Sequence, residues 1–335
     1  MGRSIVADMP APCVIGVDLG GTKVLAGVVD GDLNVHHRAH RQTLGSDQAT
    51  LLGALVSAVG ELRSASEVEV AAVGFGIPCL IDTVRGVAVS SVHVPIVDLA
   101  FADVMAERLG LPVYADNDAN AAMLAELGHG AARGARTAVM LTVGTGIGGG
   151  VVIDGEVFRG SFGSGAELGH MVIEADGPPC QGSCPNHGCL EVLASGTALG
   201  REGDRVARDA PGSALGRARR EGHPISGALV TELAHDGDRA ARDVLTLIGM
   251  RLGVGIANLV NVFNPEVVVV GGGAIAAGDL LLEPARRVVA ERALTPSREQ
   301  VRIVPARFGA ESGMRGAAAL ALAGMRGARA GGQRR

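Results

Sequence analysis

VIGVDLGGTKVLAGVVD, residues 14–30, reads as an apolar run, a glycine-rich turn and a second apolar run. Val14–Leu19 and Val24–Val29 are rich in the aliphatic residues that are typical of buried strands. The glycines between these runs lack a Cβ, so backbone N–H groups there are able to gather around an anion. An ordinary hairpin turn uses the same residue types. The stretch therefore predicts a hairpin and leaves open whether its turn binds a phosphate.

The same pattern returns 124 positions later in the chain. Val14–Leu33 aligns without gaps with Ala138–Val157, AVMLTVGTGIGGGVVIDGEV, and Asp18 then falls on Thr142. Two strand–glycine turn–strand units at matched register indicate a duplicated module. If the two turns face each other across a cleft, they hold a polyphosphate between them, so the repeat predicts a nucleotide-binding architecture.

The second glycine turn also contains a G-x-G-x-x-G pattern, within GTGIGGG at Gly144–Gly150. A dinucleotide-binding fingerprint requires a helix that opens directly after the glycines. Here Val151–Ile153 and Asp154–Gly155 follow, which are typical of a strand and a hairpin turn. The context therefore argues against a Rossmann domain.

Composition limits the function classes. The chain has 335 residues, enough for two domains, and 47% of them are apolar. No run of eighteen apolar residues occurs and the N-terminus lacks the apolar core of a signal peptide, so we expect a soluble cytoplasmic protein with no membrane partner. A net charge of −5 gives no reason to expect nucleic acid as a partner. Aromatic residues make up only 2%, so any carbohydrate must be held by hydrogen bonds rather than by stacking. Lys23, the only lysine, lies beside the first glycine turn, where an ammonium suits a phosphate.

Hydrophobic periodicity predicts alternating strands and helices beyond the first hairpin. Strands are expected at 33–43, 68–77, 111–115, 267–270 and 302–305, and helices at 49–64, 101–109, 119–127, 240–262, 280–291 and 313–328, with an Arg-rich helical region at 206–230. Gly76 ends the second of these strands, and open α/β sheets place ligands at the carboxyl ends of their strands. Gly271–Gly273, after strand 267–270, is a third place where backbone is able to approach a nucleotide.

Asp116, Asn117 and Asp118 lie between a predicted strand and a predicted helix. Carboxylates at a helix start are stabilised by the free N–H groups and the helix dipole. Capping alone needs a single Asp or Asn, and it remains the alternative interpretation. Because three such residues exceed that need, we expect one to cap the helix and another to act on a substrate hydroxyl as general base.

A cysteine cluster follows the second repeat. Cys180, Cys184 and Cys189 lie within PPCQGSCPNHGCLE, and His170 precedes them by ten residues. Three thiols and one imidazole form a closed tetrahedral zinc set, which favours a structural zinc site over a catalytic one. A disulfide or inert thiols are the alternatives, and His187 is a rival fourth ligand. A metal at this loop would also fix Glu191, two residues after the last cysteine.

Five motifs, taken together and in order, resemble the ROK family of sugar kinases and repressors. They are DLGGTK (Asp18–Lys23), DNDAN (Asp116–Asn120), GTGIGGG (Gly144–Gly150), ELGH (Glu167–His170) and CPNHGCLE (Cys184–Glu191). The resemblance runs from about Val14 to Gly324. It implies the actin-like, ribonuclease H-like ATPase fold of two α/β domains, as the repeat also suggests. We expect a smaller domain of residues 13–117 plus 312–328, a larger domain of 118–311 with the zinc loop, and flexible ends at 1–12 and 329–335.

The resemblance also implies roles for individual residues. Asp118 would be the general base for a sugar 6-hydroxyl, and the other sugar ligands would be Asn117, Glu167, His170 and Glu191, with Gly76 and His93 nearby. ATP would be bound by Asp18, close to its Mg²⁺, and by Gly20, Gly21, Thr22, Lys23, Gly144, Thr145, Gly146, Gly271 and Gly272. Zn²⁺ would be bound by His170, Cys180, Cys184 and Cys189, with the second nitrogen of His170 on the sugar.

Two departures from the family pattern bear on these expectations. The spacing from Cys180 to Cys184 is C-x3-C, where the family has C-x-C, so the zinc loop is expected to have a different shape. His93 stands where many relatives have an asparagine that touches the sugar, which affects substrate preference. Lys23 is part of the motif without an assigned role.

Four functions remain in competition. The first is an ATP-dependent glucokinase that makes glucose 6-phosphate, expected as a homo-oligomer, either dimer or tetramer. A sugar-responsive repressor is the second; only 17 residues precede Asp18, which leaves no room for a helix-turn-helix domain. The third is a kinase for N-acetylmannosamine, N-acetylglucosamine, fructose or allose. The fourth uses polyphosphate as donor, for which the chain offers no distinctive basic groove.

Overall fold

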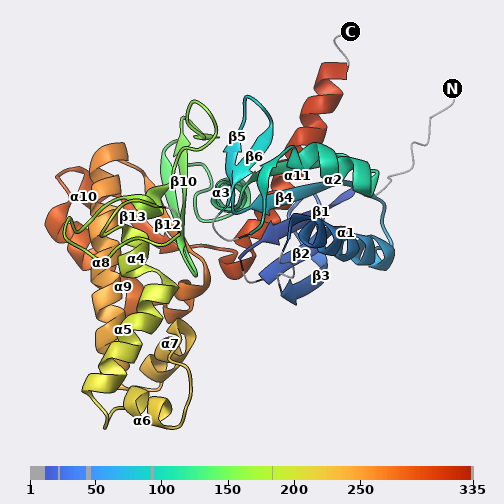
Figure 1. Cartoon of the computed structure of the whole chain (residues 1–335). Coiled ribbons are helices and arrows are strands. Elements are labelled where there is room, and N and C mark those ends of the chain that lie inside the picture. The colour runs from blue at the N-terminus through green and yellow to red at the C-terminus, as the bar shows by residue number, and fades with distance from the viewer. Residues whose placement is uncertain (1–11, 22, 43–46, 92–93, 183, 333–335) are drawn as a thin grey trace, which may run out of the picture. The chain divides into compact units, whose positions relative to one another are not determined.

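The computed structural model describes residues 12–21, 23–42, 47–91, 94–182 and 184–332 (Figure 1). The chain divides into two compact units, residues 1–125 with 313–335, and residues 126–312. Each unit has a five-stranded mixed sheet of its own with helices packed against it. The predicted α/β class, with two related halves, is therefore confirmed.

The first unit is built on a sheet in the order β3-β2-β1-β4-β8. Its strands are β1 (Cys13–Leu19), β2 (Lys23–Val29), β3 (Val35–Gln42), β4 (Val70–Ile77) and β8 (Val113–Asn117). β2 runs antiparallel to its neighbours β1 and β3, whereas β1, β4 and β8 are parallel. Its helices are α1 (Gln48–Ala65), α2 (Phe101–Leu109), the start of α3 (Asp118–His129) and α11 (Ser312–Gly332). A small antiparallel sheet of β5 (Leu80–Asp82), β6 (Val87–Ser90) and β7 (Val97–Leu99) was not predicted.

Strand alternation gives this sheet two different faces. Ile15, Val17 and Leu19 of β1 point into a core shared with α1 and α2, whereas Gly16 and Gly74 point the other way, towards α11. A Cβ on Gly74 would lie 1.8 Å from the carbonyl oxygen of Ala317, so α11 packs directly on the backbone of the sheet. Side chains alternate between the two faces along a strand, so Asp18, two residues after Gly16, lies on the face that α11 covers.

The second unit repeats this topology with the order β11-β10-β9-β12-β13. Its strands are β9 (Ala138–Val143), β10 (Ile147–Ile153), β11 (Glu156–Val157), β12 (Val267–Gly271) and β13 (Arg302–Pro305). Its helices are α4 (Leu190–Ala194), α5 (Gly196–Asp209), α6 (Ala214–Arg220), α7 (Gly227–His235), α8 (Arg239–Phe263), α9 (Asp279–Arg292) and α10 (Ser297–Gln300), with short 3-10 turns at Leu168–His170, Gly273–Ala277 and Gly309–Glu311. Figure 1 shows α8 and α9 side by side.

The internal repeat seen in the sequence is thus a structural repeat. β1 pairs with β2 and β4 as β9 pairs with β10 and β12. The two glycine turns differ by one residue: Leu19 faces Val24 across the first, and Val143 faces Ile147 across the second. The ungapped alignment therefore holds for the first strand of each hairpin and slips by one residue in the second.

α8 is the one helix among the described residues that is long and apolar enough to cross a membrane. Of its most apolar window, 61% is buried inside the protein. Leu245, Ile248, Leu252 and Ile256 on α8 pack in the core of the second unit. Its apolar character is explained by this core position.

Candidate functional site

In the first unit, the carboxyl ends of three parallel strands gather the acidic motif residues. Asp18 on β1 is paired in register with Gly76 on β4, and Gly76 with Asp116 on β8. The predicted strand 111–115 runs two residues further than expected, so Asp116 and Asn117 are its last residues. The register places Asp18, Gly76 and the start of α3 at one edge of this sheet.

The three residues of the DND motif, Asp116 to Asp118, make different contacts. Asn117 is the cap of α3, because its Oδ1 accepts hydrogen bonds from the N–H groups of Ala119 at 2.9 Å and Asn120 at 3.2 Å. Asp116 is buried and accepts from the N–H of Asn117 at 2.8 Å. Asp118, in the first turn of the helix, accepts from Ala119 N–H at 2.9 Å and stays partly exposed. The residue expected to act as base is thus not the one that caps the helix.

Asp18 lies in an environment that disfavours its charge. Burial and the nearby Asp118 carboxylate raise its pKa from 3.8 to about 7, against a smaller opposite effect of Lys23. α11 begins directly over it, since a Cβ on Gly313 would lie 2.5 Å from the Asp18 carboxyl oxygen. Two carboxylates that repel each other in this way suit a divalent cation, which would offset their repulsion. The residues therefore fit the expected Mg²⁺ of a bound nucleotide.

The turn residues are the remaining nucleotide candidates. Gly20 N–H donates to the carbonyl of Lys23 at 2.8 Å and closes the first turn, of which Thr22 lies outside the described residues. In the second unit, Gly144 N–H donates to the carbonyl of Gly146 at 2.9 Å. Gly21, Lys23 and Thr145 are exposed at these turns.

Gly271 and Gly272 lie beside the second turn, because β12 runs parallel to β9 with Gly271 opposite Thr142. Gly272 has a φ of 81°, and a Cβ there would lie 2.5 Å from the carbonyl oxygen of Val143. Only glycine suits this position. The structure therefore brings together the second turn and the third glycine cluster that the sequence singled out.

The predicted sugar ligands of the second unit surround the start of β10. Glu167 is exposed and precedes the 3-10 turn Leu168–His170, which packs on β10. Glu191, in the first turn of α4, is 7% exposed, and its Oε2 accepts a hydrogen bond from the N–H of Ile147 at 2.8 Å. His93, by contrast, lies outside the described residues.

His170 and the three loop cysteines form one cluster. The ligand atoms of His170, Cys180, Cys184 and Cys189 all lie within 4.8 Å of one another. Cys180 Sγ lies 3.5 Å from His170 Nδ1, and Cys184 Sγ lies 4.0 Å from Cys189 Sγ. His187 is exposed and does not belong to this group. All the cysteines are free thiols, so the disulfide alternative finds no support.

The donor set fits a closed zinc site. Burial and the neighbouring thiols of Cys189 and Cys184 raise the pKa of Cys180 to about 12, because a thiolate there is poorly hydrated and close to two other sulfurs. A cation at the centre would reverse this effect by stabilising the thiolates. The longer spacing between Cys180 and Cys184 does not prevent the four residues from converging.

Sequence reasoning missed two contacts at these sites. One is Gly313 over Asp18. The other is the Ser195–Gly196–Thr197 segment, whose Gly196 N–H and Thr197 hydroxyl donate to the carbonyls of Gly144 and Thr145 at 2.8 and 2.7 Å. A serine N-cap followed by Gly-Thr was visible in the sequence, but nothing there connected it with a turn fifty residues earlier.

Removing the Asp18 charge is expected to change how stability depends on pH. Because the folded pKa of about 7 exceeds the ordinary value of 3.8, the native state holds a proton that the unfolded chain releases between these values. The free energy of unfolding therefore falls as pH rises from about 4 to about 7. Asp18→Asn, measured by thermal unfolding in EDTA, should gain on the order of a few °C in Tm over wild type across that range. Parallel Tm profiles for the two proteins would contradict the electrostatic description of Asp18.

Metal analysis tests the cysteine cluster independently of activity. Protein purified without chelators should contain about one zinc per chain, and Cys184→Ser should lose most of it because three ligands hold zinc weakly. Cys13→Ala, in β1, is the matched control and should retain it. Wild-type protein without metal, equally stable before and after chelator treatment, would show that the cluster is only a group of thiols.

Comparison with known proteins shows the family of the chain. The family model described as "ROK family" matches residues 14–323. The glucokinase of Thermotoga maritima is 34% identical over 314 residues, which are 93% of this chain and 98% of the relative. The DNA-binding transcriptional repressor Mlc of Escherichia coli is 27% identical over 276 residues, 81% of this chain and 66% of that protein.

A solved structure of the same family is also similar to this chain. A ROK family glucokinase from Streptomyces griseus, in complex with glucose and AMPPNP, matches with a TM-score of 0.86 at 33% identity. The match covers 93% of this chain and 99% of that one.

Proposed function

The chain belongs to the ROK family, and we propose that it is an ATP-dependent sugar kinase that phosphorylates glucose at its 6-hydroxyl. The observation that carries this proposal is the placement of Asp118. It lies in the first turn of α3, it is not the capping residue, and it is close enough to Asp18 to raise the pKa of that carboxyl. This pairing supplies a base for the incoming hydroxyl next to a carboxylate suited to a nucleotide-bound cation.

The chemistry of phosphoryl transfer explains why these groups suffice. The reaction needs positioning, charge neutralisation and a group that accepts the hydroxyl proton. Asp118 would accept that proton in the step in which the hydroxyl oxygen attacks the γ-phosphorus and the bond to the β-phosphate oxygen breaks. Mg²⁺ near Asp18 would supply charge neutralisation on the phosphates.

The sugar contacts follow from the hydrogen bonds already present. The Oδ1 of Asn117 is occupied by two backbone N–H groups, and its Nδ2 donates to the carbonyl of Cys79 at 3.5 Å, so the second hydrogen of Nδ2 would donate to a sugar hydroxyl. Glu191 has one oxygen on Ile147 N–H and would use the other as acceptor. We assign further hydroxyl contacts to Glu167, to the second ring nitrogen of His170, and to His93 and Gly76.

The nucleotide would contact the two glycine turns. We assign its phosphates to Gly20, Gly21, Thr22 and Lys23 in the first unit and to Gly144–Gly146 in the second, and its adenosine to Gly271 and Gly272. Zn²⁺ on His170, Cys180, Cys184 and Cys189 would be structural, because four protein donors leave no open position. Its role would be to fix the His170 ring and the start of α4.

We further propose a cytoplasmic homo-oligomer, dimer or tetramer, whose partners are the sugar and ATP. The regulator among the relatives makes a sugar sensor without turnover the second candidate. The presence of Asp118 favours the kinase, because a sensor does not need a base.

Replacing the proposed base tests the function directly. Asp118→Asn should lower kcat on the order of 10²–10⁴-fold, which is the usual contribution of a general base, and should leave the Kd for glucose within a few-fold. The measurements are a coupled ADP assay and isothermal titration calorimetry.

Asp103→Asn is the matched control, because Asp103 is an exposed carboxylate on α2. It should behave as wild type in both assays. If Asp118→Asn kept near-wild-type kcat, Asp118 would lose the role of base. If wild type bound glucose without forming ADP, the sensor would be the better description.

A further inference from the structure

The segment from Glu191 to Thr197, here called the strap, is tied to the second glycine turn at three points. Glu191 Oε2 accepts from Ile147 N–H at 2.8 Å, Gly196 N–H donates to Gly144 O at 2.8 Å, and the Thr197 hydroxyl donates to Thr145 O at 2.7 Å. All of these residues belong to the second unit. Gly144 and Thr145 of the turn, and Ile147 directly after it at the start of β10, are thus hydrogen-bonded to the strap.

Gly146 contacts the strap in a different way. A Cβ at this position would lie 2.2 Å from Glu191 Oε2, so the Glu191 carboxylate occupies the space that any other residue would fill. A Cβ on Gly144 would meet nothing within 4 Å. The turn therefore needs glycine at 146 to accommodate Glu191, and it has no such need at 144.

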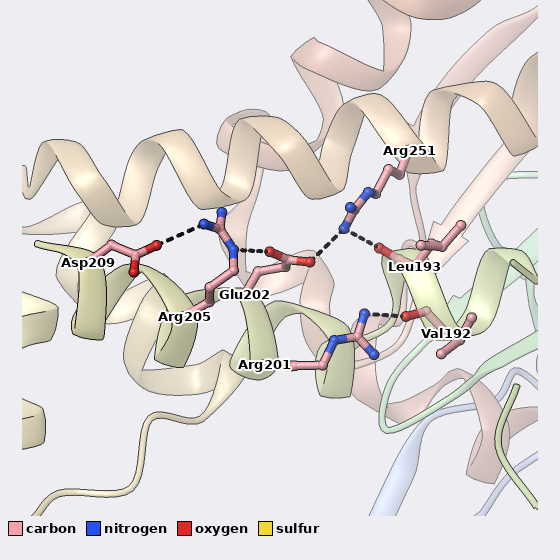
Figure 2. A network of polar contacts seen from close by, with 7 residues as sticks. All are labelled: Val192, Leu193, Arg201, Glu202, Arg205, Asp209 and Arg251. Carbon is pink, nitrogen blue, oxygen red and sulfur yellow. Dashed lines mark hydrogen bonds and ion pairs between the residues drawn. The ribbon is translucent and has the colours of Figure 1, made fainter. Parts of the chain in front are cut away.

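The far end of the strap's helix is held by charged groups on two other helices. The carbonyl of Val192 accepts from Arg201 on α5 at 2.7 Å, and that of Leu193 from Arg251 on α8 at 3.4 Å (Figure 2). Arg251 is in turn paired with Glu202 at 3.0 Å. Cations at the last carbonyls of a helix stabilise its end. These bonds anchor the end of α4, and Glu191 in its first turn is bonded to Ile147, the residue that follows the glycine turn.

We propose that the strap couples the two substrates: sugar held by Glu191 and polyphosphate held by the turn at 144–146 each tighten the binding of the other. This inference rests on the proposed function, which places the sugar on Glu191 and the phosphates on the turn. Both ligands would contact the same hydrogen-bonded segment, so the arrangement of the segment that favours one ligand also favours the other. Linkage requires the effect to be equal in both directions.

The strap offers two kinds of variant with matched controls. Gly146→Ala pushes the Glu191 carboxylate away from Ile147 N–H, and Gly212→Ala, between α5 and α6, places the same methyl group in open space away from the turn. Neither glycine has a positive φ, so alanine fits both backbones. Thr197→Val removes only the hydroxyl bond to Thr145. Its control is Thr231→Val, because the Thr231 hydroxyl bonds within α7, to the Gly227 carbonyl.

Calorimetric titration of glucose into the full chain, with and without saturating AMPPNP and Mg²⁺, measures the coupling. Wild type should bind glucose on the order of tenfold more tightly when the nucleotide is present. Gly212→Ala and Thr231→Val should keep this ratio. Gly146→Ala should weaken glucose binding alone and bring the ratio close to one, and Thr197→Val should lower the ratio several-fold with little change in glucose binding alone.

The outcomes separate this inference from the proposed function. If wild type binds neither glucose nor AMPPNP, the proposed function fails and the inference with it. If wild type binds both without mutual effect, or if Gly146→Ala and Thr197→Val keep the wild-type ratio, the proposed function stands and the inference is overturned. If circular dichroism shows that Gly146→Ala is unfolded, Thr197→Val alone tests the inference, because its change is confined to the side chain of an exposed residue. A lowered ratio in Thr197→Val then supports the coupling, and a wild-type ratio overturns it.

Discussion

The parallel register of β1, β4 and β8 is the constraint on which the first unit's site depends. It sets Asp18, Gly76 and Asp116 side by side at the carboxyl edge of the sheet, and α3 then begins with Asp118. This arrangement disfavours the charged form of Asp18, because burial and the nearby Asp118 carboxylate raise the pKa of Asp18 to about 7. Such groups destabilise a fold unless a ligand or ion offsets their charge, so carboxylates held this way are typical of functional sites.

The second unit has the same sheet topology as the first, but its glycine turn has different neighbours. Thr142 of β9 stands where β1 of the first unit has Asp18, so no acidic residue stands at the equivalent place. Instead, hydrogen bonds from the strap hold the turn, and Cys189 of the cysteine cluster lies two residues before the strap begins. The metal loop, the buried Glu191 and the turn therefore form one connected structure. The cysteine cluster is thereby connected to the residues that we assign to the sugar and the phosphates.

Much of this architecture could be predicted from the sequence, because the signals were local. The duplicated hairpins, the DND motif after a strand and the cysteine spacing each lie within about thirty residues. What could not be predicted depends on contacts between distant segments: Gly313 over Asp18, and Thr197 on the Thr145 carbonyl. The residues alone left His170 and His187 open as the fourth ligand, the family resemblance favoured His170, and the structure places His170 in the cluster. The small β5–β7 sheet was missed because its strands have three or four residues each, too few for a periodic pattern.

The central claim is that a sugar 6-hydroxyl attacks ATP. Phosphorus NMR of the product formed from carbon-13-labelled glucose, ATP and Mg²⁺ tests it most directly, because it shows which carbon carries the new phosphate. The account predicts a single phosphomonoester whose phosphorus couples to C6, formed together with one ADP per sugar. A phosphate on any other carbon, or ADP and free phosphate with unchanged glucose, would contradict it.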